Sequence, residues 1–108
     1  MTNKGLQIGN YIKRNGLVVR VDEQTFWDIK NFPEQYEYIE LTEEWLLRLG
    51  FERVGIFAEF RKKNITLGFV AGNGQQWQLI INRTCTEVIL RHVHKLQNIY
   101  FHLKDEEL

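Results

Sequence analysis

Serine is absent from this chain of 108 residues, and cysteine, proline and methionine each occur only once. Without serine, the protein has no serine nucleophile for covalent catalysis. The single cysteine, Cys85, excludes a disulfide within the chain, which is typical of proteins in a reducing cytoplasm. No stretch approaches the roughly 20 apolar residues that a membrane-spanning helix needs, and no apolar run opens the chain. We therefore expect a cytoplasmic protein with no membrane partner.

An excess of charge of one sign is also missing, because 14 Lys and Arg residues balance 14 Asp and Glu residues. General nucleic-acid-binding proteins usually carry a basic excess, so this balance argues against that class. Two short basic segments remain, Lys13-Arg14 and Arg61-Lys62-Lys63, each at a predicted hairpin tip. They keep a nucleic-acid-binding accessory protein as an alternative, in which exposed aromatic rings near the tips stack on bases. The more common role of such charges is to keep hairpin tips soluble.

The residues that are present suffice for one α+β domain. The apolar fraction is 44% and the aromatic fraction 13%, and a chain of this length fits one compact domain. We find no internal repeat, linker or low-complexity tract. The sequence therefore predicts a single domain over residues 1–108, in which residues 1–5 form a flexible tail.

The N-terminal part predicts a β-hairpin over Leu6 to Asp22, because Asn15-Gly16 is the strongest short hairpin signal. This hairpin resembles the opening of a small curled sheet or of an SH3-like barrel, and one hairpin does not specify which. The next segment has no clean period, and Pro33 blocks a long helix there. We predict a third strand over Thr25 to Ile29 and then a loop. The candidate aromatic surface of this segment comprises Trp27, Tyr36 and Tyr38.

The middle of the chain predicts a short helix and then a sheet. A helix is predicted over Leu41 to Phe51. Thr42 suits its N-cap, and Gly50 suits the left-handed conformation that ends a helix. Its expected buried side comprises Trp45, Leu46 and Leu49. From Phe51 to Leu90, apolar and polar residues then alternate, which predicts a four-stranded antiparallel meander with one covered face. The alternating positions of its first strand are Val54, Ile56, Ala58 and Phe60, and the predicted turns are at residues 62–64, 71–74 and 83–84.

The C-terminal segment, His92 to Leu108, has the clearest helical repeat. An apolar stripe recurs at intervals of three, four and three residues, and Ile99 widens it. Because a short helix is marginal alone in water, the stripe must be buried against another element. We predict that this helix packs on the sheet and completes the α+β fold. The stripe comprises Val93, Leu96, Tyr100 and Leu103.

A polar face of the same helix is the candidate partner-binding site. It comprises His94, Gln97 and Asn98, and His94 and Asn98 point about 100° or more away from the centre of the apolar stripe. Gln97 lies at the boundary, where it can instead bond to a strand carbonyl. Two interpretations stay open: the face contacts a ligand or partner, or it is the solvated back of a buried helix.

The spacing of the histidines does not favour a metal site. On a helix, His92 and His94 diverge by about 200°, and His94 and His102 lie about 12 Å apart. Cys85 has no partner at the spacing of a metal site, and no local signature supports a Cys-His catalytic pair. We therefore predict no metal, no cofactor and no catalytic residue.

Three stretches resemble an uncharacterised family of short bacterial proteins that are carried on phages and mobile elements. They are Leu6 to Tyr11, the pattern LTEEWL at Leu41 to Leu46 with Gly50-Phe51, and the pattern VHxLQNxYFxLxxEEL from Val93 to Leu108. Family residues Gln, Ala, Thr and Gly are replaced here by Lys95, His102, Lys104 and Asp105. The resemblance therefore favours His94, Gln97 and Asn98 as shared residues over His102, and it implies no activity.

Two function classes follow from these observations, with an enzyme as a third. The first is a non-enzymatic binding module for a host protein or a small ligand, acting in a bacterial cell. The second is the nucleic-acid-binding accessory protein. An enzyme would need a deep pocket that holds a titratable group with a perturbed pKa.

Overall fold

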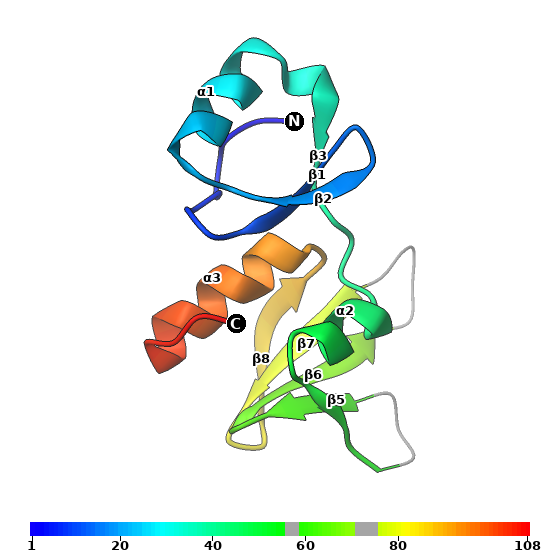
Figure 1. The fold of residues 1–108 in the computed structure, drawn as a ribbon. Helices are drawn as coiled ribbons and strands as arrows, with labels where there is room; N and C mark the ends of the chain where they lie inside the picture. The colour runs from blue at the N-terminus through cyan, green and yellow to red at the C-terminus, as the bar shows by residue number, and fades with distance from the viewer. Residues whose placement is uncertain (56–58, 71–75) are drawn as a thin grey trace. The chain divides into compact units, whose positions relative to one another are not determined.

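A computed structural model describes residues 1–55, 59–70 and 76–108 (Figure 1). The fold is α+β, as the sequence predicts. The chain divides into two compact units. Residues Met1–Ile39 and His92–Glu107 form the first, called here the N-terminal unit. Glu40–Arg91 form the second, together with Leu108, and this is called the meander unit.

The N-terminal unit contains a three-stranded antiparallel sheet of order β2-β1-β3. The strands are β1 (Tyr11–Arg14), β2 (Leu17–Arg20) and β3 (Tyr36–Glu37). The predicted hairpin is confirmed, because β1 pairs with β2 around a turn in which Asn15 has φ 49° and Gly16 has φ 82°. Both central residues of a type I′ turn require a positive φ, which explains the Asn-Gly pair.

A helix replaces the strand that we predicted over Thr25 to Ile29, so that prediction is wrong. Helix α1 (Glu23–Asn31) starts with a capping box at Asp22. The Asp22 carboxylate accepts a hydrogen bond from the Thr25 amide at 2.9 Å, and the Thr25 hydroxyl accepts one from the Asp22 amide at 3.1 Å. Such reciprocal bonds satisfy two amides that a helix start otherwise leaves unpaired. Pro33 then opens the 3-10 turn η1 (Pro33–Gln35).

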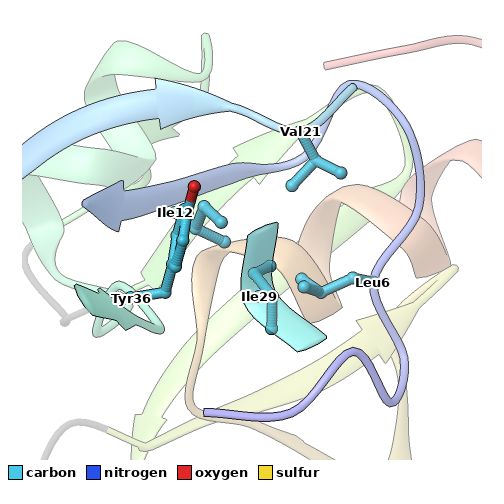
Figure 2. Packing of buried hydrophobic residues seen from close by; sticks show 5 residues of the cluster. All are labelled: Leu6, Ile12, Val21, Ile29 and Tyr36. Atoms are coloured by element: carbon cyan, nitrogen blue, oxygen red, sulfur yellow. The ribbon is translucent and has the colours of Figure 1, made fainter. Parts of the chain in front are cut away.

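The core of the N-terminal unit contains side chains from the segment before β1, from the hairpin, from α1 and from β3. The segment before β1, residues 1–10, is called here the entry segment. Figure 2 shows these five buried residues together: Leu6, Ile12, Val21, Ile29 and Tyr36. Met1 packs against this cluster, and its amino group donates to the Pro33 carbonyl at 3.3 Å. Thr2 accepts a hydrogen bond at its carbonyl from the Tyr38 hydroxyl at 3.0 Å. The first residues of the chain thus contact the body of their unit.

Helix α3 (Val93–Lys104) belongs to the N-terminal unit and contacts β1, so the prediction of a C-terminal helix on a sheet is confirmed. The sheet that it contacts is the N-terminal one, whereas we predicted the meander. Val93, Leu96 and Tyr100 are fully buried, which confirms three positions of the apolar stripe. The prediction for the fourth position of the stripe is wrong, because Leu103 is 42% exposed. Leu103 lies in the last turn of the helix, which ends where Asp105 takes a left-handed conformation.

The meander unit opens with α2 (Glu43–Arg48), as the sequence predicts. The Thr42 hydroxyl accepts a hydrogen bond from the Trp45 amide at 3.3 Å, and Gly50 has φ 92°. The Phe51 amide donates to the Leu46 carbonyl at 2.9 Å and closes the helix end. The predicted buried side is also confirmed at Trp45, Leu46 and Leu49.

Five strands follow in an antiparallel sheet of order β4-β5-β6-β7-β8. They are β4 (Glu52–Arg53), β5 (Glu59–Lys62), β6 (Ile65–Val70), β7 (Gln76–Ile81) and β8 (Thr84–Leu90). The predicted antiparallel meander is confirmed, with the two-residue strand β4 added at its edge. The predicted first strand is wrong at Val54, which lies between β4 and β5, where Gly55 has φ 64° and the chain turns. The turn predicted at residues 83–84 lies one position earlier, at Asn82 and Arg83. Predictions for Ile56, for Ala58 and for the turn at residues 71–74 fall outside the described residues.

The alternation along these strands separates a covered face from an open one. Trp77 anchors the covered face, where its indole N–H donates to the Leu41 carbonyl at 2.8 Å. Successive residues of a strand point to opposite faces, so the residues between the buried ones form the open face. The buried positions are Phe60, Ile65, Leu67, Trp77, Leu79 and Leu90.

Candidate functional site

The open face of the meander carries one row of side chains that crosses four strands. Arg61 on β5 lies opposite Thr66 on β6, and Thr66 lies opposite Ile80 on β7. Ile80 in turn lies opposite Cys85 on β8. Residues directly opposite each other on neighbouring strands point to the same face, so all four share the open face.

Two hollows meet over this row. The smaller has a volume of about 400 Å³, and it is lined by Val54, Glu59, Arg61, Thr66, Ile80, Arg83 and Cys85. The larger has a volume of about 540 Å³, and it is lined by Glu52, Arg53, Val54, Gly55, Arg61 and Lys63. Val54 and Arg61 line both hollows, and the two hollows together are called here the open-face groove.

Basic side chains outnumber acidic ones in the open-face groove, with four against two. This local excess stands out in a chain whose total charge is zero. One of the four, Arg53, is already engaged, because it forms an ion pair with Glu43 at 2.9 Å. Arg61 and Arg83 are exposed, and neither side chain has a hydrogen bond or ion pair with the part of the chain that the structure describes.

The position of Arg83 is set by a turn between β7 and β8. Asn82 and Arg83 both have a positive φ, 48° and 65°. The neighbouring hairpin turn holds this one, because the Asn64 side-chain amide donates to the Asn82 side-chain oxygen at 2.8 Å. The Asn82 backbone amide also donates to the Asn64 carbonyl at 3.3 Å. Arg83 therefore lies in a turn that is hydrogen-bonded to the β5–β6 turn.

Cys85 is exposed and carries a free thiol on the open face. Among the described residues, no histidine lines either hollow of the open-face groove. All three histidines belong to the N-terminal unit, whereas Cys85 belongs to the meander unit. The groove therefore offers cations, one threonine hydroxyl and apolar contacts, which are the means of binding a ligand.

His94, the first residue of the predicted polar face, is buried and only 1% exposed. Its ring stacks on the Tyr38 ring, with 4.6 Å between the ring centroids. Neither ring nitrogen has a hydrogen-bond partner among the described residues. Burial is the main cause that lowers the pKa of His94 from 6.5 to about 4, and positive charge on His92 and Lys95 contributes to the same shift. His94 is therefore neutral at physiological pH.

Gln97 and Asn98 are occupied by the segment that leads into β1. The Gln97 side-chain oxygen accepts from the Tyr11 amide at 2.8 Å, and its nitrogen donates to the Gly9 carbonyl at 3.3 Å. The Asn98 oxygen accepts from the Asn10 side chain at 2.8 Å, and its nitrogen donates to the Gly5 carbonyl at 2.6 Å. We call Asn10, Gln97 and Asn98 the amide clamp.

The interpretation of the polar face as a solvated back is therefore wrong at His94 and Gln97, which are both buried. The helix is covered on more than its apolar stripe because the entry segment supplies backbone groups that pair with these amides. Partner binding by His94, Gln97 and Asn98 remains a prediction.

The three predicted surface aromatics lie in three different settings. Trp27 on α1 is 58% exposed. Tyr36 is in the core, and its hydroxyl donates to the Asp28 carboxylate at 3.3 Å. Tyr38 is half-buried and stacks on His94. Only Trp27 of the three therefore presents a largely exposed ring.

Comparison with protein-family models, with curated proteins and with solved structures found no match. The family resemblance therefore stays a prediction. In the described parts of the chain, no helix is long and apolar enough to cross a membrane. The same parts contain no group of three or more His, Cys, Asp or Glu side chains that could hold a metal ion.

Proposed function

We propose that this protein is a non-enzymatic binding module that takes a host protein or a small ligand in the open-face groove. Following the family resemblance, we place it in the cytoplasm of a bacterial cell as an accessory protein of a phage or mobile element. The observation that carries the proposal is the pair of exposed arginines, Arg61 and Arg83, which have no ion-pair partner among the described residues.

The groove also has the mixed character that ligand recognition uses. Binding sites combine apolar contact with a few charged or hydrogen-bonding groups that fix orientation. Here Val54 and Ile80 supply the apolar contact, while Thr66 and the two arginines supply the polar groups. The candidate residues on α3 support a binding role less directly, because Gln97 and Asn98 already make internal hydrogen bonds.

Affinity capture from host lysate, with mass spectrometry of retained proteins and metabolites, tests this proposal. The bait is the wild type beside the double variant Arg61→Gln, Arg83→Gln. The matched control is Arg91→Gln, because Arg91 is exposed and lines neither hollow. We expect a component that the wild type and the control retain and the double variant loses. Identical retention by all three proteins would remove the open-face groove as the binding site.

Nucleic-acid binding is the second candidate function. One observation favours it, because Arg61 and Lys63 of the predicted basic segment both line the groove. Phosphate contacts make affinity fall steeply with salt. Binding of single-stranded DNA or RNA that weakens in this way would select the second candidate, and no binding at low salt would exclude it.

A further inference from the structure

We infer that the open-face groove binds a phosphate group of its ligand between Arg61 and Arg83. This inference rests on the proposed function and names the chemical class of the ligand. Both arginines line the smaller hollow, and both leave their guanidinium groups without a partner in the described residues. A guanidinium presents a planar fork of N–H donors that matches the oxygens of a phosphate.

The charge of the smaller hollow favours an anion. Its lining holds Arg61 and Arg83 against one carboxylate, Glu59. The second carboxylate of the groove, Glu52, lines only the larger hollow. Glu52 lies directly across from Arg61 on β4, yet no ion pair between them forms. Among the described lining residues, basic side chains therefore outnumber carboxylates in the smaller hollow, and an anion is attracted to it.

The remaining lining suits an organic phosphate. Thr66 offers a hydroxyl beside Arg61 on the open face, and hydroxyl groups donate hydrogen bonds to phosphate oxygens. Val54 and Ile80 offer apolar surface that inorganic phosphate cannot use. We therefore expect an organic phosphate ester to bind more tightly than inorganic phosphate. The ester is supplied either by a free nucleotide or by the backbone of a nucleic acid.

Cys85 provides a reporter inside the site, because it is the only cysteine of the chain, is exposed and lines the smaller hollow. The experiment measures the rate at which a bulky maleimide labels Cys85 in the full chain. The probes are inorganic phosphate, adenosine monophosphate and a short single-stranded oligodeoxythymidine, with succinate as a carboxylate without phosphate. Each is added to the wild type and to the variants Arg61→Gln, Arg83→Gln and Arg91→Gln.

We expect a phosphate-bearing probe to slow labelling in the wild type and in Arg91→Gln. Removal of either groove arginine should raise the concentration needed for protection by about tenfold or more, because a charge-assisted hydrogen bond is lost. Protection by adenosine monophosphate identifies a free ester as the source. If the oligonucleotide alone protects Cys85 and this protection weakens steeply with salt, the source of the phosphate is the nucleic-acid backbone. A melting curve for each variant shows that it remains folded, and Arg61→Lys and Arg83→Lys replace any Gln variant that does not.

The inference is overturned if no phosphate-bearing probe slows labelling, or if protection is equal in all variants. Host lysate, with its own thiols blocked beforehand so that they do not consume the maleimide, is the arm that separates this failure from failure of the proposed function. If lysate slows labelling in an arginine-dependent way but no phosphate-bearing probe does, the proposed binding function is retained and the inference of a phosphate ligand is wrong. If lysate does not slow labelling either, and the capture experiment retains no arginine-dependent component, both proposals fail.

Discussion

A buried carboxamide carries N–H donors and a carbonyl acceptor, and its burial costs free energy unless these groups are paired. Gln97 and Asn98 meet this requirement with three backbone groups and the Asn10 side chain, all about 90 positions away in the sequence. Gln97 bonds to Tyr11 and Gly9, and Asn98 bonds to Gly5 and Asn10. Such a satisfied polar network fixes how α3 lies on the entry segment, in addition to stabilising the contact.

Gln97→Ala tests the amide clamp at one residue. The substitution leaves the Tyr11 amide without its acceptor, so we expect the free energy of unfolding to fall by about 1–3 kcal/mol. Urea denaturation measures the change. Gln7→Ala is the matched control, because that side chain is exposed, and it should shift the value by no more than about 0.5 kcal/mol. Equal effects of the two substitutions would show that the clamp does not hold the helix.

The triple variant His94→Ala, Gln97→Ala, Asn98→Ala tests the prediction of partner binding at the same face. If these residues hold α3 in place, the variant melts well below the wild type. A variant that melts with the wild type but loses a partner from lysate would instead support the binding prediction made from the sequence.

His94 makes stability depend on pH. The folded protein holds the pKa of His94 at about 4, whereas the ordinary value is 6.5. The unfolded chain therefore binds more protons between these values, and stability is lost as the pH falls from about 6.5 towards 4. The expected slope is at most about 1.4 kcal/mol per pH unit. Urea titrations at pH 5 and pH 7 measure it.

Two variants separate His94 from the other histidines in that measurement. His94→Gln should flatten the pH dependence, because the titrating ring is removed. His102→Gln should leave it unchanged, since His102 is exposed. A slope that survives in His94→Gln would assign the pH dependence to another group.

At the scale of elements, local signals predicted most of the secondary structure. Asn15-Gly16 set the hairpin through their positive φ values. Thr42 and Gly50 set α2, Thr42 through its side-chain hydrogen bond to the Trp45 amide and Gly50 through its positive φ. Helix α1 was missed because its packed side has only two apolar residues, Phe26 and Ile29, while Trp27 is exposed. Asp22 and Thr25 carried its start signal as a capping box, which uses Thr25 where Glu or Gln is usual.

The apolar stripe of α3 gives the prediction for a whole element. Leu96→Ala and Tyr100→Ala should each lower the free energy of unfolding by about 2–5 kcal/mol, because both side chains are fully buried. Leu103→Ala is the control, since Leu103 is 42% exposed, and it should change the value by less than about 0.5 kcal/mol. Chemical denaturation measures all three, and a small effect at both buried positions would contradict the docking of α3.

At the scale of the whole molecule, the candidate site was only partly predictable. Arg61 was noticed within a basic segment, but Arg83 was not, because its place in the same hollow as Arg61 depends on how β5 to β8 pair. A sequence shows alternation along one strand, whereas it does not show which residues of separate strands lie opposite each other. The burial of His94 was missed for a similar reason, since Tyr38 stacks on it from a distant part of the chain.

The measurement that tests the central claim most directly is a titration of ¹⁵N-labelled protein with adenosine monophosphate, followed by amide chemical shifts. If the open-face groove binds the phosphate, the largest shifts occur at Arg61, Thr66, Ile80 and Arg83. The amides of His94 to Asn98 should keep their chemical shifts, and Arg61→Gln should raise the concentration needed for the same shifts by about tenfold or more. Shifts that are largest on α3 would contradict the account, as would shifts absent from every assigned amide with both adenosine monophosphate and the oligodeoxythymidine.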